Sequence, residues 1–167
     1  DLGVFGQIYE TFLSELQSAG TLGEFYTPRS ITSLLTLILD PKENESIYDP
    51  ACGTGGMLLE CINYLKNKKK NFKTIKIFGQ EKNLSTSSIA KINMFLHEIE
   101  DFKIIKGDTL KDPKFFDKDK LKKFDCVIAN PPFSLDKWGQ ENWINDPFKR
   151  NKYGIPPSGN GDMAWLQ

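Results

Sequence analysis

The sequence has 167 residues, and its 22 basic and 22 acidic side chains give a formal net charge of zero at pH 7. Hydrophobic residues make up 39% and charged residues 26%, which is typical of one ordinary globular domain with a sizeable core. No apolar stretch approaches the roughly 20 residues that a membrane-spanning helix needs, and no signal peptide is evident. The neutral balance leaves binding to nucleic acid open, because a local basic patch can hide in a neutral total.

The cysteines and the two ends of the chain give further bounds. Cys52, Cys61 and Cys126 have no CxxC pair and no metal-ligand spacing, so we expect three buried, reduced thiols and a cytoplasmic protein. The chain begins without Met. It ends at Gln167, directly after residues 162–166, which have the pattern of a helix that is just starting. We therefore expect the sequence to be a piece of a longer protein.

Two amphipathic helices are expected first. Residues 3–18 place apolar side chains at helical spacing, and a stretch with two glycines follows. Thr27 and Pro28 predict the next helix start, with Thr27 as N-cap and Pro28 at the first helical position, and Asp40-Pro41 ends that helix. The residues expected to line the two apolar faces are Phe5, Ile8, Tyr9, Phe12, Leu13 and Leu16, then Ile31, Leu34, Leu35 and Ile38.

Short strands and helices then alternate. Strands are expected at residues 46–49, 74–79, 102–105 and 124–129. Two helices separate the first three strands, with apolar faces made of Leu58, Cys61, Ile62 and Leu65, and of Ile89, Ile92, Leu96 and Ile99. This rhythm predicts an α/β fold with a doubly wound, mainly parallel sheet.

Residues 134–160 lack periodicity, and a loop of that length is usually functional or mobile. Its aromatic and basic side chains could approach a DNA strand, although ordinary packing and solvated charge explain them equally simply. These side chains are Trp138, Trp143, Lys149, Arg150 and Lys152. We interpret the lysine-rich run at residues 66–73 as a solvated loop, and we assign no catalytic role to His97, the only histidine.

The segment DPACGTGG follows the first strand directly. Gly53, Gly55 and Gly56 allow a tight turn and a close approach of the backbone to a ligand at a helix N-terminus. The spacing is neither GxGxxG nor a phosphate loop. Asp49 opens the turn and would repel a pyrophosphate but attract a cation, so its charge suits a ligand with ammonium and sulfonium groups such as S-adenosylmethionine. A turn-forming role for the Asp49 side chain is the simpler alternative.

Two more acids stand at the ends of the next two strands. Glu81 could accept hydrogen bonds from the two hydroxyls of a ribose, and Asp108 from the amino group of an adenine. Each acid alone could equally be a surface charge. Three acids at three successive strand ends favour a nucleoside-binding edge.

The last strand runs directly into Asn130-Pro131-Pro132-Phe133. The prolines end the strand and present Asn130 and Phe133 on a stiff turn. The Asn130 amide oxygen and the Pro131 carbonyl could accept both hydrogens of an exocyclic amine, which would free the nitrogen lone pair for a methyl group. Phe133 could stack on the base, and that base would first have to leave its duplex.

In this order and spacing, DPACGTGG, Glu81, Gly107-Asp108 and NPPF resemble the amino-methylating DNA adenine methyltransferases. GEFYTPR, with the helix IYETFLSEL before it, is similar to the modification subunit of type I restriction–modification systems. The resemblance covers residues 3–167. It implies the S-adenosylmethionine-dependent methyltransferase fold, with residues 1–20 ending an N-terminal helical domain and residues 21–167 forming a catalytic core that continues beyond this sequence.

The resemblance also implies a role for each matching residue. The residues of GEFYTPR would contact the methionine end of S-adenosylmethionine, and they are Glu24, Phe25, Tyr26, Thr27, Pro28 and Arg29. Thr54, Gly55 and Gly56 would cradle the cofactor, Glu81 would hold its ribose, and Asp108 would lie near its adenine. Asn130, Pro131, Pro132 and Phe133 would bind the target, and Asn at position 130 is the form associated with adenine-N6.

The resemblance further implies three partners: double-stranded DNA, a specificity subunit that reads the DNA sequence, and a restriction subunit that cleaves. Two alternatives stay open. A protein-glutamine N-methyltransferase also uses NPP with an aromatic residue, although GEFYTPR before the first strand disfavours it. A non-catalytic cofactor-binding or assembly module is the other, and the intact NPPF disfavours that.

Overall fold

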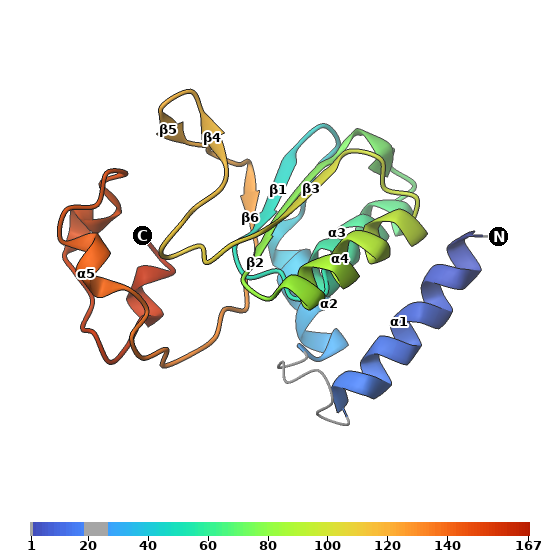
Figure 1. The fold of residues 1–167 in the computed structure, drawn as a ribbon. Helices are drawn as coiled ribbons and strands as arrows, with labels where there is room; N and C mark the ends of the chain where they lie inside the picture. Colours follow the sequence, from blue (N-terminus) through green and yellow to red (C-terminus); the bar gives the residue numbers. More distant parts are fainter. Residues whose placement is uncertain (1, 19–26) are drawn as a thin grey trace.

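The computed structural model describes residues 2–18 and 27–167 (Figure 1). The predicted cofactor contacts Glu24, Phe25 and Tyr26 lie outside these residues. No helix within the described ranges is both long and apolar enough to cross a membrane. Cys52, Cys61 and Cys126 are buried thiols outside any disulfide, as expected.

A four-stranded parallel sheet forms the centre of the fold. Its strands are β1 (Ser46–Asp49), β2 (Lys76–Glu81), β3 (Phe102–Lys106) and β6 (Cys126–Val127), in the spatial order β3-β2-β1-β6. The chain moves outward from β1 to β3 and then returns to place β6 on the other side of β1. In open α/β sheets, ligands bind at the carboxyl ends of the strands where the order reverses in this way. The predicted α/β class and parallel sheet are confirmed.

The longer helices gather on one side of the sheet in Figure 1. They are α1 (Leu2–Ser18), α2 (Arg29–Leu39), α3 (Gly56–Asn67) and α4 (Leu84–Leu96). Apolar side chains from α3 and α4 join the strand residues Ile47, Ile77 and Ile104 in one buried cluster. The predicted face of α3 is confirmed, because Leu58, Cys61, Ile62 and Leu65 are all buried there.

The other side of the sheet carries an aromatic cluster that the sequence analysis did not identify. Tyr48 and Phe78 alternate with the isoleucines along β1 and β2, so their rings point away from the helices. Tyr48 stacks on Phe124 with 4.4 Å between ring centroids, and Phe115 meets both Tyr48 and Phe78 edge to face. Both faces of the central strands are therefore covered.

The prediction for α2 was wrong in two respects. The helix begins at Arg29 with Pro28 as its N-cap, so Thr27 is not the cap. Ile31, Leu34 and Ile38 are exposed, whereas Thr32 and Thr36 are buried and only Leu35 and Leu39 of the leucines pack on the core. Small threonine side chains allow close packing of α2 on α3. The Thr32 hydroxyl donates to the carbonyl of Arg29, and the Thr36 hydroxyl lies 3.9 Å from the Cys61 sulfur of α3.

The other boundaries differ by a few residues. Residues 72–74 form a 3₁₀ turn, so β2 begins at Lys76 rather than at residue 74. In α4 Ile92 is exposed, and the helix buries Ala90, Asn93 and Met94 instead. A small antiparallel hairpin, β4 (Phe116–Asp117) with β5 (Lys120–Leu121), was not expected.

Residues 134–167 form a second small core rather than an extended loop. Three short helical turns, α5 (Gln140–Trp143), η2 (Arg150–Tyr153) and η3 (Asp162–Ala164), surround a cluster of Leu110, Trp138, Trp143 and Ala164. We call this the satellite cluster. The indole N–H of Trp138 donates to the carbonyl of Pro157 (2.9 Å), and that of Trp143 to the carbonyl of Leu110 (2.8 Å).

The packing alternative therefore holds for the two tryptophans, which are fully buried and cannot stack on a DNA base. It also holds for Arg150, because its guanidinium pairs with buried Asp146 at 2.9 Å and donates to the carbonyl of Thr109. Lys149 and Lys152 are exposed.

Candidate functional site

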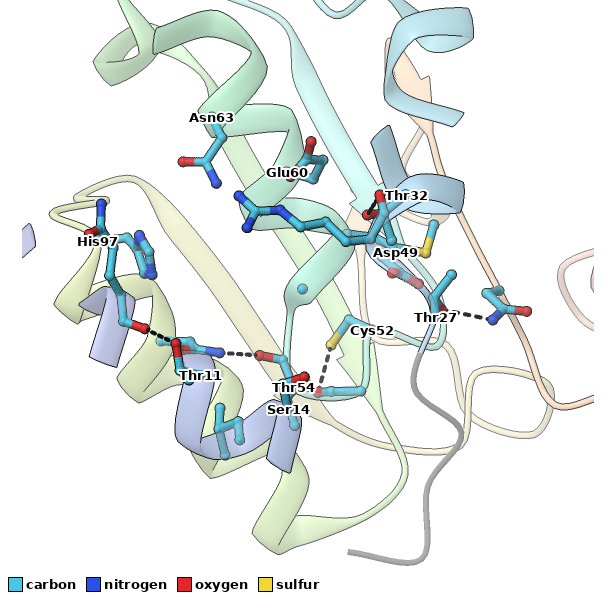
Figure 2. Close-up of a pocket in the computed structure, with 18 of the residues that line it drawn as sticks. Thr11, Ser14, Thr27, Thr32, Asp49, Cys52, Thr54, Glu60, Asn63 and His97 are labelled. Carbon is cyan, nitrogen blue, oxygen red and sulfur yellow. Dashed lines mark hydrogen bonds between the residues drawn. The ribbon is translucent and has the colours of Figure 1, made fainter. Parts of the chain in front are cut away.

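A cavity of about 880 Å³ opens at the carboxyl ends of β1 and β6 (Figure 2). Its floor is formed by the start of α3 and by residues 51–56, which we call the glycine turn. Thr27, at the entry to α2, and Asn130, just after β6, stand on one side of it. Residues of α1 line the opposite side. The cavity thus lies at the switch point that the strand order defines.

The glycine turn is held by hydrogen bonds to neighbouring elements. The backbone N–H of Cys52 donates to the carbonyl of Gln80 at the end of β2 (3.0 Å). The Asn93 amide of α4 donates to the carbonyl of Thr54 (2.9 Å). Gly55 has a φ of +87°, and a Cβ there would lie 2.7 Å from the Met94 side chain, so this position requires glycine.

Gly56 begins α3, a helix of 12 residues, and lines the cavity. A Cβ built at Gly56 meets nothing within 4 Å, so the helix N-terminus opens onto free space. N-terminal backbone N–H groups of a helix favour anionic or electron-rich groups of a ligand. The turn is therefore a shaped cradle with room above it.

Asp49 lines the cavity although its residue surface is only 2% exposed. Its Oδ1 accepts a hydrogen bond from the backbone N–H of Ala51 (2.9 Å). Burial raises the pKa of the Asp49 carboxyl to about 7, and the Ala51 bond opposes this shift while the charge of Glu81 adds to it. A buried carboxyl in this state gains stabilisation from a cationic ligand group.

Glu81 lies at the end of β2 as expected, but it does not line the cavity. Its Oε2 accepts from the backbone N–H of Gly53 (3.0 Å) and its Oε1 from that of Asn83 (2.8 Å). The bond from Gly53 holds the glycine turn to the end of β2. Its contact with a ribose stays a prediction.

Asp108 follows β3 and also lies outside the cavity lining. Its Oδ2 pairs with Lys82 Nζ at 3.1 Å, and its Oδ1 accepts from the backbone N–H of Leu110 (3.2 Å). Its place near an adenine stays a prediction.

The segment from Asn130 to Phe133 forms the outer edge of the site. Asn130 lines the cavity, and its Nδ2 donates to the hydroxyl of Thr27 at 2.8 Å, which is the dashed line that leaves Thr27 in Figure 2. Pro131 is half-buried and Pro132 is exposed. The Phe133 ring is 74% exposed, so a flat face is available to a partner.

Pro28 does not line the cavity, whereas its neighbours Thr27 and Arg29 do. Further lining residues were missed by the sequence analysis, among them Thr32, Glu60 and Asn63 (Figure 2). Glu60 and Asn63 are three residues apart on α3, so they share a face. That spacing was the available signal. Glu60 also accepts from the Ser33 hydroxyl (2.7 Å), which links α3 to α2.

Comparison with known proteins gives a consistent picture. The model of the family described as N-6 DNA Methylase matches residues 1–167. The methylase subunit of the type I restriction enzyme HindI from Haemophilus influenzae is 36% identical over 98% of this chain and 36% of its own length. The crystal structure of a type I restriction-modification methyltransferase subunit from Streptococcus thermophilus superposes with a TM-score of 0.71. It is 30% identical, over 86% of this chain and 31% of that chain.

A more distant neighbour supports the fold alone. An S-adenosylmethionine-dependent O-methyltransferase from Thermotoga maritima, 23% identical, superposes with a TM-score of 0.51 over 65% of this chain and 37% of its own. The chain spans about a third of the length of each of these relatives.

Proposed function

Because the chain belongs to the N-6 DNA Methylase family, we propose that it is part of a DNA methyltransferase subunit that transfers a methyl group from S-adenosylmethionine to N6 of an adenine. The resemblance to modification subunits of type I systems is confirmed by the relatives, and the fold is that of S-adenosylmethionine-dependent methyltransferases. The adenine target and the transfer itself are the proposal.

One observation carries the proposal. The sequence predicts that Asn130 binds the target and that Asp49 binds the cofactor. Both residues line the same cavity. A methyl transfer requires donor and acceptor sites to adjoin, because the reacting atoms must approach to roughly 3–3.5 Å. The glycine turn between them leaves room for a ligand.

The chemistry of the lining fits S-adenosylmethionine, which supplies an electrophilic methyl group on a sulfonium. Asp49 would stabilise its positive charge, and Arg29 would pair with its carboxylate, so the lining offers one charge of each sign to an ammonium and a carboxylate. Thr54, Gly55 and Gly56 would support it from the floor. Glu81 would hold the ribose with the lone pairs that its two backbone bonds leave free.

Asn130 and Pro131 would prepare the target nitrogen. The lone pair of an adenine amine is delocalised into the ring, so the amine is a poor nucleophile. The Oδ1 of Asn130 and the carbonyl of Pro131 would accept its two hydrogens and draw the nitrogen towards tetrahedral geometry. Such preorganised acceptors act most strongly where water is excluded. No general base is needed before transfer, because the methylated ammonium product loses its proton readily.

Phe133 would receive the base after it leaves the duplex. Flipping is required because the amine is unreachable within the stack. A ring that is 74% exposed beside Asn130 offers a stacking face worth roughly 1–3 kcal/mol. The recognition sequence would be read by a specificity subunit, and a restriction subunit would complete the assembly.

The test uses the longest natural polypeptide that contains this sequence, with its partner subunits, double-stranded DNA and S-adenosylmethionine labelled on the methyl group. We expect labelled N6-methyladenine after digestion to nucleosides, and far slower labelling by the Asn130→Ala variant. Label on a cytosine would overturn the adenine assignment. Label on a protein glutamine would support the alternative of a glutamine methyltransferase, and cofactor binding without any labelled product would support a non-catalytic module.

A further inference from the structure

We propose that Thr27 is a positioning residue that holds the Asn130 amide in place, with its oxygen towards the target base. The inference rests on the proposed function, and it gives Thr27 a different task from the cofactor contact that the sequence resemblance implies. Its basis is the 2.8 Å bond from Asn130 Nδ2 to Thr27 Oγ1, which joins two residues 103 positions apart.

The bond has a fixed anchor on the Thr27 side. Pro28 follows Thr27 directly and caps α2, and the Pro28 carbonyl accepts from the backbone N–H groups of Ile31 and Thr32. The backbone at Asn130 is also constrained, because the two residues that follow it are Pro131 and Pro132. Thr27 and Asn130 therefore meet at a defined place in the lining of the cavity.

A primary amide has two chemically opposite ends. Its oxygen can accept from an amine, whereas its nitrogen can only donate and would repel the amine hydrogens. Rotation about the last side-chain torsion exchanges the two ends, and that torsion has broad, roughly two-fold preferences. An Asn130 without a partner would therefore spend part of its time with the wrong end towards the base.

In the structure the Thr27 hydroxyl accepts from Nδ2 (2.8 Å), and a target amine that donates to Oδ1 favours this orientation over the reverse one, in which the hydroxyl would donate to Oδ1. The oxygen then lies on the other branch of the amide, and none of the residues that the structure describes donates a hydrogen bond to it. An acceptor left free in this way is what the target amine needs. Accepting from the amine also polarises the amide, which strengthens the Nδ2 bond to Thr27.

The experiment compares Thr27→Val, which keeps the shape and removes the hydroxyl, with Thr27→Ser, which keeps the hydroxyl. We expect Thr27→Val to lower the single-turnover methylation rate about tenfold, in line with one lost hydrogen bond, with KM for S-adenosylmethionine changed less than about twofold. Thr27→Ser should retain at least about half of the rate. Thr36→Val is the matched control, because it removes a buried hydroxyl from α2, the helix that follows Thr27, outside the cavity lining.

A cycle with Asn130→Ala isolates the route of the effect. If Thr27 acts through Asn130, adding Thr27→Val to Asn130→Ala should slow the residual rate no further. A raised KM for S-adenosylmethionine with an unchanged rate would overturn the proposal and make Thr27 a cofactor contact. Equal rates for Thr27→Val and the wild type would also overturn it.

A second measurement does not depend on methylation. In the same polypeptide labelled with ¹⁵N-asparagine, the Asn130 side-chain amide signals are assigned by their loss in Asn130→Ala. We expect one of the two protons to shift upfield in Thr27→Val and to stay in place in Thr27→Ser. If no methyladenine forms in the wild type, the proposed function fails, and this shift alone decides whether Thr27 orients the amide. Unmoved signals would overturn the inference.

Discussion

The two sides of the cavity are built differently. The proposed cofactor side, made of Asp49 and the glycine turn, contains a buried carboxyl and is tied to β2 and α4 by hydrogen bonds. The proposed base side, made of residues 130–133, has one side-chain bond to the described residues, that to Thr27, and an aromatic residue that is open to solvent. A small cofactor can enter a preformed pocket, whereas a base that is still attached to its DNA needs an exposed ring on which it can stack.

Different cores support the two sides. The main core lies directly beneath the glycine turn. The base side continues into the satellite cluster through a bond from the backbone N–H of Ser134 to Asp162 (2.6 Å) and one from Gly161 to the carbonyl of Leu135 (3.0 Å). The two sides can therefore be perturbed separately, and the following predictions use that separation.

Trp143→Ala should have the largest effect. It removes a fully buried indole from the satellite cluster, so we expect the free energy of unfolding to fall by about 3–5 kcal/mol. Hydrogen exchange should speed up across residues 130–167 and stay unchanged at residues 46–60. Ile144→Ala, at a neighbouring exposed position, is the control and should cost under about 0.5 kcal/mol. Faster exchange in the glycine turn would show that the two cores unfold as one.

Asn130→Ala should separate chemistry from cofactor binding. We expect the single-turnover methylation rate to fall by roughly 10²–10³, because a preorganised acceptor at the reacting nitrogen is lost. The affinity for S-adenosylmethionine, measured by titration calorimetry, should change less than about twofold. A parallel loss of both would mean that the base side also shapes the cofactor pocket.

Asp49→Asn should weaken binding of the cofactor, the step that Asn130→Ala is expected to leave intact. It keeps an acceptor for the Ala51 N–H but removes the charge, so we expect S-adenosylmethionine to bind about 10–100 times more weakly at pH 8. Calorimetry on Asp119→Asn, at an exposed position away from the cavity, is the control. Unchanged affinity in Asp49→Asn would remove the role proposed for this acid.

The same carboxyl predicts two dependences on pH. Its pKa is raised from 3.8 to about 7 in the folded chain, so its contribution to stability is fully present below pH 3.8 and is lost as the pH rises through 7. Between pH 4 and pH 8 the wild type should lose up to about 4 kcal/mol relative to Asp49→Asn in urea unfolding. A cationic ligand favours the charged carboxyl, so affinity for the cofactor should rise over the same range, with proton release visible as a buffer-dependent heat. Parallel pH profiles for the two proteins would contradict both expectations.

Phe133→Ala should have the smallest effect. Loss of one stacking face worth roughly 1–3 kcal/mol should raise KM for DNA about 5- to 150-fold. Stability should change by under about 0.5 kcal/mol, since the ring is 74% exposed. Tyr153→Ala removes another exposed aromatic ring, outside the cavity lining, and should leave KM unchanged. Equal effects of the two variants would indicate a general loss of surface rather than a base-stacking site.

The sequence predicted the central strands and α3 well, because apolar runs and glycines mark them directly. It failed for α2, where the residues that pack are Thr32 and Thr36 and the exposed ones are Ile31 and Ile38. Hydrophobic periodicity cannot anticipate a helix that needs small side chains at its contact.

The satellite cluster was missed because its residues follow no period. The buried Trp138 and Trp143 donate hydrogen bonds to the carbonyls of Pro157 and Leu110, which are distant in the sequence. No local sequence pattern predicts such partners. The site residues were placed at strand ends by their motifs. Their contacts were not predictable, since the bond between Thr27 and Asn130 depends on the path of the whole sheet.

The strand order has a consequence for synthesis of the chain. β6 pairs with β1 although β2 and β3 are made between them, so the cofactor side can close while the base side is still on the ribosome. Asn130 can reach Thr27 only after β6 has joined the sheet. We therefore expect a nascent chain to pass through a stage in which the glycine turn is formed and nothing yet holds the target amine. If the chain acts as proposed, the growing protein would bind the methyl donor in that stage before it could modify DNA.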